Sequence, residues 1–233
     1  DTDYIFHLGE YARVEQSFNN FEEVLTDNLA GTAAIINFWK KSNAKLIYAG
    51  SSTKFSDNGL GYTSSPYALT KAHNTELISN AAKWYELKYA ITYFYNVYGG
   101  REQSYGDKAT LIGIFRRQMY EKQPLSVRLP GSQQRNFTHI NDIIEGICKV
   151  AFNGEGDGYG IGASETYSIL EVANMFGGEI EYLKSRAGNR TNGLLLTDKT
   201  ELLGWKQQVS LKQYISNLRE NDWIDPIGSS KHI

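Results

Sequence analysis

The sequence is poor in features that would point to a secreted or membrane-bound protein. Its single cysteine, Cys148, excludes an internal disulfide bond and is typical of a protein that works in a reducing compartment. No apolar run approaches the length that a helix needs to cross a bilayer, and the first residues lack a secretory signal pattern. We therefore expect a cytoplasmic protein that has no membrane partner.

A long run of basic residues is also missing. The net charge is −2, and acidic and basic residues are interspersed along the chain. The densest basic spot is Arg116-Arg117, which the solvated face of a helix explains. Nucleic acid is therefore not an expected partner. The four histidines and the one cysteine show no metal-ligand spacing, so we expect no metal site.

The first half of the chain alternates between strand-like and helix-like segments. Apolar runs that end near glycine predict strands at residues 3–8, 45–49 and 89–97. Apolar residues at helical intervals predict a helix over residues 21–41 and another from Tyr67 onward. This alternation implies βαβ units and a parallel sheet, with the carboxyl ends of the strands gathered at one edge.

The second half contains shorter elements. We expect helices over residues 109–121 and 142–151, the second capped by Asp142, and strands at residues 125–129 and 179–183. A further strand is expected within the glycine-rich residues 154–162. Capping-box patterns at Ser168 and Ser210 predict that two more helices begin there.

The most informative residues are Tyr67 and Lys71, the only Tyr-x-x-x-Lys pair in the chain. Ser65 as N-cap and Pro66 at the first helical position predict that a helix begins just before the pair. Four residues make about one helical turn, so both side chains lie on one face, where an ammonium group favours the ionised form of a phenol. Ser51 can then hydrogen-bond the substrate oxygen on which Tyr67 acts. One such pair is also about what chance would give, so its context matters.

With these segments in order, the chain resembles the extended short-chain dehydrogenase/reductase family, and most of all its nucleotide-sugar epimerases of the UDP-glucose 4-epimerase type. The resemblance runs from Tyr4 to about Leu218. It rests on the order and spacing of these segments: His7-Leu8-Gly9; Asn28-x-x-Gly31-Thr32; Gly50-Ser51-Ser52-Thr53; Ser65-Pro66-Tyr67-x-x-x-Lys71; Tyr95-Asn96-Val97-Tyr98-Gly99; Pro130-Gly131-Ser132-Gln133-x-Arg135-Asn136-Phe137-x-His139; and Leu203-Gly204-Trp205.

The resemblance implies an α/β fold with a Rossmann-type parallel sheet and a smaller C-terminal α/β substrate domain. Residues 1–98 would form the remainder of an NAD-binding domain. Residues 99–221 would mainly form the domain that binds the nucleotide sugar, although part of this segment would return to the Rossmann domain. Residues 222–233 would be a tail. The family's glycine-rich turn, which holds the cofactor pyrophosphate, does not occur in this sequence. The chain starts where the family's fourth strand would be, so we expect the leading strands to be missing from it.

The resemblance also implies roles for individual residues. Arg135 and Arg186 match two arginines that clamp the sugar-nucleotide diphosphate, for which a planar guanidinium gives bidentate contact. A surface arginine is the plainer interpretation of each. The implied catalytic residues are Ser51, Tyr67 and Lys71. The implied residues for NAD are Leu8, Gly9, Asn28, Gly50, Tyr67, Lys71 and Tyr95, and those for the nucleotide-diphosphate sugar are Ser51, Asn96, Thr110, Leu111, Arg135 and Arg186.

The residues after Ser51 favour epimerisation over dehydration, because Ser52 and Thr53 stand where related dehydratases carry an Asp-Glu pair. The expected reaction is inversion at C4 through a transient 4-keto sugar. Another nucleotide-sugar oxidoreductase or dehydratase of the family, and a non-catalytic dinucleotide-binding protein, remain alternatives. Glu10 replaces a small residue near the nicotinamide, either as a specificity feature or as mere variation. The resemblance also implies a homodimer that packs through the helices from Phe21 and from Tyr67.

Overall fold

A four-stranded parallel sheet forms the centre of the larger part of the molecule. The computed structural model describes residues 2–55, 59–185 and 194–225. The strands occur in the order β1-β2-β3-β8, and every neighbouring pair is parallel. This arrangement confirms the expected α/β fold. The four strands are β1 (Tyr4–His7), β2 (Lys45–Ser51), β3 (Tyr89–Phe94) and β8 (Gly156–Ile161).

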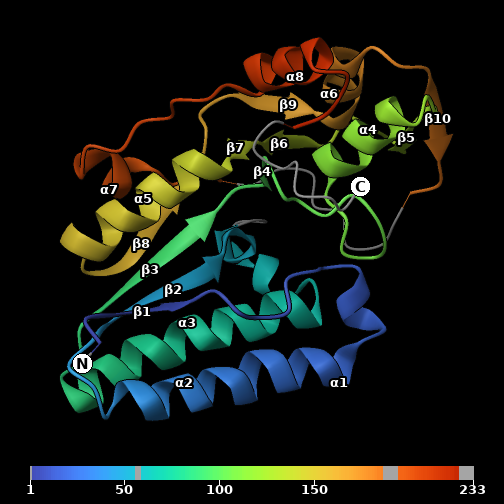
Figure 1. Cartoon of the computed structure of the whole chain (residues 1–233). Coiled ribbons are helices and arrows are strands. Elements are labelled where there is room, and N and C mark those ends of the chain that lie inside the picture. Colours follow the sequence, from blue (N-terminus) through green and yellow to red (C-terminus); the bar gives the residue numbers. More distant parts are fainter. Residues whose placement is uncertain (1, 56–58, 186–193, 226–233) are drawn as a thin grey trace.

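Helices cover both faces of this sheet (Figure 1). One face packs against α2 (Gly31–Trp39) and α3 (Pro66–Tyr85), with Trp39, Tyr48 and Ile78 fully buried between the layers. The other face packs against α5 (Ile140–Asn153), where Ile47, Val150 and Trp205 form a second core. The predicted helix over residues 21–41 is helical throughout residues 21–39, but a π-helical segment, η2 (Leu25–Ala30), separates α1 (Phe21–Val24) from α2.

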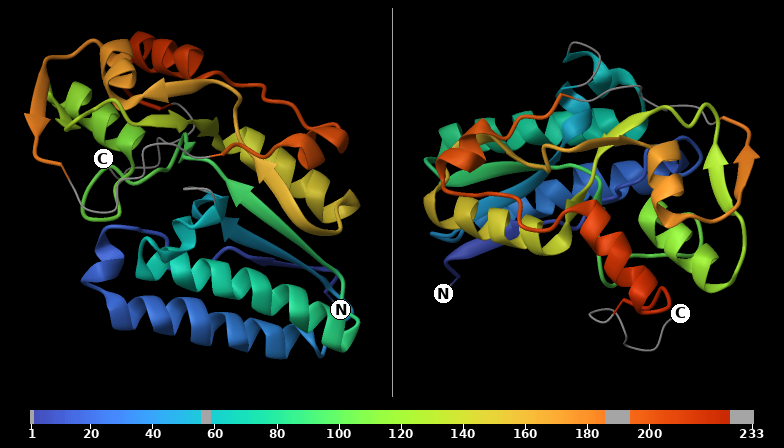
Figure 2. Two further views of the ribbon diagram at one scale, coloured as in Figure 1. Left: turned by 180° about the vertical axis from the view of Figure 1, so that it is seen from behind. Right: turned by 90° about the horizontal axis from the view of Figure 1, so that it is seen from above.

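The second half of the chain builds a smaller unit with its own core. Its parallel strand pair is β5 (Leu125–Arg128) and β10 (Ile180–Leu183). Buried side chains such as Phe115, Phe176 and Leu218 pack α4 (Leu111–Tyr120), α6 (Ile169–Phe176) and α8 (Leu211–Glu220) together. Seen from behind, the red α8 and the blue α2 lie at opposite ends of the molecule (Figure 2).

Short elements connect the two units. The parallel pair β4 (Val97–Tyr98) and β7 (Thr138–His139) lies between them, and β6 (Gln134–Asn136) pairs with β9 (Thr166–Ser168) in antiparallel fashion. The remaining helical turns are η1 (Gln16–Phe18), η3 (Ser52–Phe55), η5 (Gly61–Thr63) and α7 (Asp198–Leu202). Within the described residues, no helix combines the length and apolar character that spanning a bilayer requires.

The predicted strand over residues 89–97 is longer than the strand that forms. β3 ends at Phe94, and Asn96 has φ 36°, which lies in the left-handed region and turns the chain out of the sheet. The next strand, β4, then pairs with β7 instead of continuing the main sheet. This turn places Asn96 at the boundary between the two units.

Two helix starts follow the sequence prediction. The Ser65 hydroxyl accepts the Ala68 N–H at 3.1 Å, and Pro66 is the first residue of α3. Ser168 and Glu171 form a complete capping box at the start of α6. Both signals are local, because the cap and the backbone group that it binds are close in sequence.

The prediction that Asp142 caps a helix was wrong. α5 begins earlier, and its N-cap is His139, whose ring Nδ1 accepts the Asn141 N–H at 3.3 Å. The Asp142 carboxylate instead accepts the backbone N–H groups of Gln208 and Val209, each at 3.1 Å. Asp142 therefore fixes a distant segment to the first turn of the helix.

Candidate active site

A cleft of about 890 Å³ opens at the carboxyl ends of the parallel strands. Leu8 follows β1, Gly50 and Ser51 end β2, and Phe94 ends β3, so three adjacent strands contribute to one wall. The smaller unit supplies the facing wall through residues 97–103, residues 109–112 and Arg135. This is the edge at which open α/β sheets bind ligands, and the volume suits a small-molecule site of roughly 300–1,000 Å³.

The cleft brings together most of the residues that the sequence singled out, although they are far apart along the chain. Arg186 lies outside the described residues. The predicted site residues that line the cleft are Leu8, Gly50, Ser51, Tyr67, Lys71, Asn96, Thr110, Leu111 and Arg135.

Three predicted cofactor residues do not line the cleft. Gly9 is exposed beside Leu8. Asn28 is completely buried, and its side chain accepts the Tyr11 N–H at 2.7 Å and donates to the Thr70 hydroxyl at 2.9 Å. Tyr95 is buried too, and its hydroxyl donates to the carbonyl oxygen of Leu194 at 3.0 Å. Asn28 and Tyr95 fix the surrounding backbone in this structure.

Tyr67 and Ser51 present hydroxyl groups to the same cleft. Tyr67 lies at the second position of α3, is half-buried, and its hydroxyl has no hydrogen-bond partner within the described residues. Ser51 is the last residue of β2, and its Oγ lies 2.8 Å from Oγ1 of Thr53. The phenol is therefore available to a ligand, whereas the serine is oriented by a neighbouring hydroxyl.

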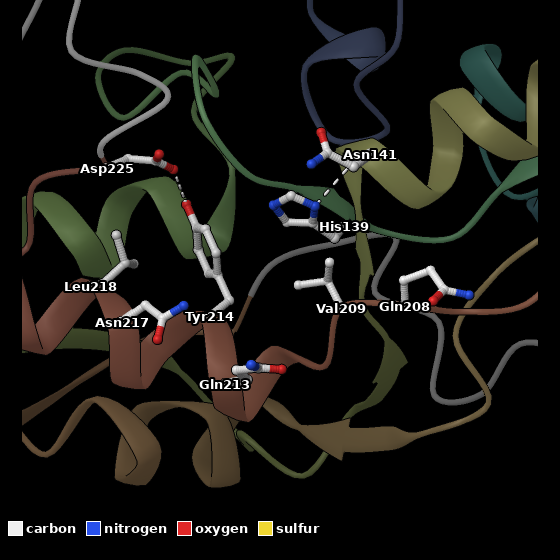
Figure 3. A pocket seen from close by; sticks show the side chains of 9 residues that line it. All are labelled: His139, Asn141, Gln208, Val209, Gln213, Tyr214, Asn217, Leu218 and Asp225. Atoms are coloured by element: carbon white, nitrogen blue, oxygen red, sulfur yellow. Dashed lines mark hydrogen bonds between the residues drawn. The ribbon is translucent and has the colours of Figure 1, made fainter.

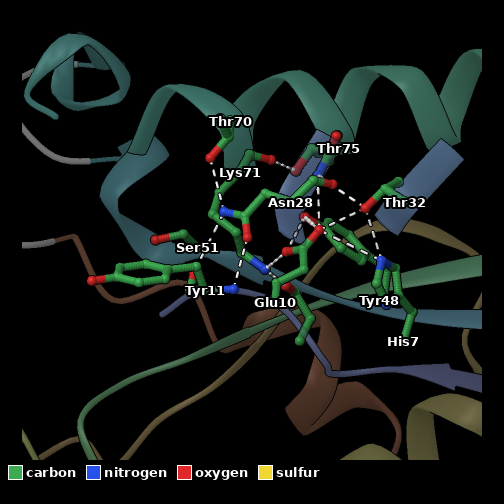
Figure 4. Close-up of polar contacts among 12 residues, drawn as sticks. His7, Glu10, Tyr11, Asn28, Thr32, Tyr48, Ser51, Thr70, Lys71 and Thr75 are labelled. Carbon is green, nitrogen blue, oxygen red and sulfur yellow. Dashed lines mark hydrogen bonds and ion pairs between the residues drawn. The ribbon is translucent and has the colours of Figure 1, made fainter. Parts of the chain in front are cut away.

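Lys71 lies one turn beyond Tyr67, but its ammonium group is held by other residues (Figure 4). Nζ of Lys71 donates to the carboxylate of Glu10 and to the carbonyl oxygen of Ala49. It also lies 4.6 Å from the centre of the Tyr48 ring. An ammonium carries three N–H donors, so two are used inside the protein and one remains for a ligand.

Glu10 is the centre of a buried polar network (Figure 4). Its side chain is 2% exposed and accepts hydrogen bonds from Thr32 and Asn74, each at 2.7 Å, and from Tyr48 at 2.9 Å. Burial by itself would raise the pKa of this carboxyl. The hydrogen bond from His7, the charge of Lys71 and the other donors outweigh burial and lower the pKa to about 2. Glu10 is therefore a stable carboxylate in the wall of the cleft.

Sequence reasoning missed two further groups of the cleft. Arg13 is half-buried and follows β1, and Glu102 lies on the opposite wall. The Glu102 carboxylate accepts the Thr110 hydroxyl at 2.5 Å, and burial raises its pKa to about 7. Neither residue belongs to a local pattern, so no sequence signal distinguished them from surface charges.

A second cavity, of about 290 Å³, lies beside α8 (Figure 3). Tyr214 donates to Asp225 at 2.5 Å at this cavity, and burial lowers the pKa of His139 on its wall. It contains no pair like Tyr67 and Lys71, and it lies away from the strand ends. Among the described residues, no cluster of histidine, cysteine and carboxylate side chains suits a metal ion. The larger cleft is therefore the candidate active site.

Comparisons with known proteins agree with this geometry. The family model for the NAD dependent epimerase/dehydratase family matches residues 1–162. A Methanocaldococcus jannaschii protein that is named, provisionally, a UDP-glucose 4-epimerase is 28% identical over 94% of this chain and 76% of its own length. A dTDP-D-glucose 4,6-dehydratase of Mus musculus is 24% identical over 94% of this chain and 67% of its own length.

A solved structure shares both the fold and the arrangement of the units. It is a UDP-glucuronic acid 4-epimerase from Bacillus cereus in complex with UDP-glucuronic acid and NAD. It has a TM-score of 0.84 and 26% sequence identity, and the match covers 94% of this chain and 75% of that one. Because the family model matches well over half of the sequence, the chain belongs to the NAD dependent epimerase/dehydratase family.

Proposed function

We propose that this protein catalyses the NAD-dependent epimerisation, at C4, of a nucleotide-diphosphate sugar. The observation that carries the proposal is the hydroxyl of Tyr67, which has no hydrogen-bond partner in the part of the chain that the structure describes. It shares one cleft with Ser51 and Lys71 at the strand ends of a parallel sheet. Relatives named as 4-epimerases, and a similar structure that holds NAD and a UDP-sugar, support the same chemistry.

The residues of the cleft fit the nicotinamide end of NAD. Leu8 and Gly50 offer an apolar side chain and a small residue at adjacent strand ends. The remaining N–H of Lys71 is suited to a ribose hydroxyl, because its other donors are bound to Glu10 and Ala49. When bound there, NAD supplies the acceptor for the hydride from the sugar and later returns it.

In this proposal, Tyr67 is the acid and base of the reaction. As a phenolate it takes the proton from the C4 hydroxyl while the C4 hydride leaves the sugar, which gives a 4-keto sugar. Ser51 hydrogen-bonds the reacting oxygen and holds it near Tyr67. After the keto sugar turns in the cleft, Tyr67 would give the proton back to the C4 oxygen, and bound NAD would supply the hydride to the other face. No net oxidation results.

The facing wall would hold the rest of the substrate. The guanidinium of Arg135 lies at the cleft and suits a diphosphate, because its planar fork pairs with two phosphate oxygens. The amide of Asn96 is fixed by donating to the carbonyl oxygen of Asn136 at 2.9 Å, so it reaches the cleft in a set orientation. Thr110 and Leu111 begin α4 and would line the nucleobase pocket.

Two side chains favour epimerisation over dehydration. Elimination of water from a sugar needs a carboxylic acid and a carboxylate base beside the reacting carbons. Here Ser52 and Thr53 follow Ser51, and both line the cleft with hydroxyl groups. Neither hydroxyl can replace those carboxyl groups at neutral pH. Dehydration, the reaction named for the mouse relative, is therefore the weaker candidate.

The proposal is tested by replacing Tyr67 with phenylalanine, which removes only the hydroxyl. Candidate nucleotide sugars are incubated with NAD, and the C4 epimers are quantified by NMR while absorbance reports any net reduced cofactor. We expect turnover to fall at least ~100-fold in Tyr67→Phe, because acid–base catalysis contributes about 10²–10⁴-fold. Nucleotide-sugar affinity should be nearly unchanged.

The matched control is Tyr120→Phe, since this tyrosine is 43% exposed and does not line the cleft. The control should keep the parental rate. A Tyr67→Phe protein with near-parental turnover contradicts the assignment of Tyr67, and accumulation of reduced cofactor points to a net oxidoreductase instead.

A further inference from the structure

The turn that follows β2 presents a row of hydroxyl side chains to the cleft. Ser51, Ser52 and Thr53 all line it, and all three are buried. Oγ of Ser51 lies 2.8 Å from Oγ1 of Thr53, and the N–H of Thr53 donates to Oγ of Ser51 at 3.3 Å. The direction of the Ser51 hydroxyl therefore depends on the conformation of η3, the turn to which Thr53 belongs.

An ion pair outside the cleft joins this turn to the far strand of the sheet. Lys54 follows Thr53 in η3, and its Nζ lies 3.2 Å from Oδ2 of Asp157 on β8. The two side chains are 30% and 35% exposed, and neither residue lines the cleft. The pair spans 103 positions of the sequence. It therefore attaches the turn to β8 without contacting any ligand that the cleft could hold.

Tyr93 of β3 connects this ion pair to the strand that carries Ser51. Its hydroxyl donates to Oδ1 of Asp157 at 2.6 Å, and burial, followed by the charge of Asp157, raises the pKa of Tyr93, so the phenol is a neutral donor. A Cβ at Gly50 would lie 2.6 Å from the Tyr93 ring, so this ring packs directly against the residue before Ser51. The ring of Phe55 meets the same ring edge-on, with the centroids 4.7 Å apart.

The turn depends on these outside contacts for its conformation. A 3₁₀ turn of four residues has poor hydrogen-bond geometry of its own, so contacts with other elements decide how it lies. Tyr93 and Phe55 place its two ends by packing, whereas Lys54 adds the one charged contact that is printed for the turn. A partly exposed ion pair is too weak to decide whether a protein folds, but it can bias a short segment between conformations.

We propose that Lys54 is a positioning residue for the proposed reaction, because its ion pair with Asp157 holds η3 in the conformation that orients the Ser51 hydroxyl toward the reacting oxygen of the sugar. Lys54 contacts neither substrate nor cofactor and acts through Thr53 and Ser51. This inference rests on the proposed function, and in particular on the role of Ser51. It does not depend on which nucleotide sugar is the substrate.

The kinetic test compares Lys54→Met, which keeps a long side chain without its charge, with Lys54→Arg, which keeps the charge. Epimerisation is measured with UDP-glucose and with UDP-glucuronic acid as probes. Lys54→Met should lower kcat about fivefold, which corresponds to about 1 kcal/mol, the upper end for a partly exposed ion pair. KM should stay within about twofold, because the loss concerns orientation in the transition state and not binding. Lys54→Arg should restore most of the parental kcat.

A second readout needs neither substrate nor cofactor. NMR of ¹⁵N-labelled protein follows hydrogen exchange of the Thr53 N–H, which donates to Ser51. Lys54→Met should speed this exchange about fivefold, because the same ion pair then no longer favours the closed turn, and Lys54→Arg should not.

The matched control is Lys149→Met. Lys149 forms an ion pair with Glu145 on α5 at 3.6 Å, the two side chains are 31% and 43% exposed, and neither residue lines the cleft. Removing this charge should leave both kcat and the exchange of Thr53 unchanged.

The pairing of the two charges is tested by combining Lys54→Met with Asp157→Asn, which keeps Oδ1 as an acceptor for Tyr93. Substitutions of two residues that act through one contact are not additive. In the Asp157→Asn protein, Lys54→Met should therefore lower kcat and speed exchange little further.

The inference is overturned if Lys54→Met behaves like Lys149→Met, if exchange quickens without a loss of kcat, or if the effects of Lys54→Met and Asp157→Asn add in full. A raised KM with an unchanged kcat also overturns it, because Lys54 would then affect binding. Should Asp157→Asn not fold, as circular dichroism would show, the comparison of Lys54→Met with Lys54→Arg decides alone. A parental protein that is inactive on both sugars, while Lys54→Met still quickens exchange, would contradict the proposed function and support the role of Lys54 in orienting Ser51.

Discussion

The buried ion pair between Glu10 and Lys71 makes a quantitative prediction about stability. The surrounding donors lower the pKa of Glu10 from its ordinary value of 4.5 to about 2, although burial opposes this. One pKa unit corresponds to about 1.4 kcal/mol, so the ionised carboxylate contributes about 3 kcal/mol to the free energy of unfolding at pH 7. The side chain is 2% exposed, so solvent screens this contribution only weakly.

The sign of the pH dependence follows from the direction of the change. The pKa in the folded protein is below that of the unfolded chain, so the contribution is present above pH 4.5 and is lost as the pH falls toward 2. Replacing Glu10 with glutamine keeps the shape but removes the charge, and it leaves Lys71 buried without its partner. Breaking a buried pair in this way costs about 3–5 kcal/mol in other proteins, which is the same scale.

The assay is urea unfolding followed by tryptophan fluorescence at pH 7 and at pH 3.5. We expect Glu10→Gln to lower the free energy of unfolding by about 3 kcal/mol at pH 7 and by about 2 kcal/mol at pH 3.5. The matched control is Glu76→Gln on α3, where the glutamate is exposed and has no described ion pair. It should change stability by less than about 0.5 kcal/mol at either pH.

A loss below about 1 kcal/mol at pH 7 would refute the reasoning, because it would mean that the network does not hold the carboxylate in its charged form. An equal loss of unfolding free energy at pH 7 and at pH 3.5 would also refute the reasoning. The effect of Glu10→Gln would then come from a change of shape and not from the loss of charge.

Two further predictions concern other parts of the molecule. Burial raises the pKa of Glu102 from 4.5 to about 7, so its contribution to stability is fully present below pH 4.5 and is lost as the pH rises through about 7. Glu102→Gln should therefore remove a decline in thermal stability between about pH 4.5 and pH 7, and an unchanged decline would contradict this. The homodimer that the family resemblance implies would pack through α2 and α3, on which Phe38 and Trp84 are 53% and 64% exposed. The double variant Phe38→Glu with Trp84→Glu should therefore be a folded monomer when its mass is measured by light scattering. A dimer that survives both substitutions would place the interface elsewhere.

Local sequence signals determined the elements that carry the proposed chemistry. Ser65 and Pro66 set the start of α3, and the helical repeat then put Tyr67 and Lys71 on one face. The alternation of strands and helices likewise determined a parallel sheet with its strand ends at one edge. Such signals are readable because each depends on residues within a few positions of one another. The same reasoning failed for Asp142, whose partners lie more than sixty residues away.

Tertiary structure alone decided which charges act together at the site. Glu10 and Lys71 are 61 positions apart, and Arg13 reaches the carbonyl oxygen of Lys108 across 95 positions. A lysine can pair with a carboxylate or remain a free charge. The outcome depends on how the segment after β1 crosses the strand ends, and on how much water that packing excludes. Neither the pairing nor the exclusion of water is encoded in any short stretch of the chain, so the sequence supplied the side chains proposed for catalysis and the fold determined their electrostatic surroundings.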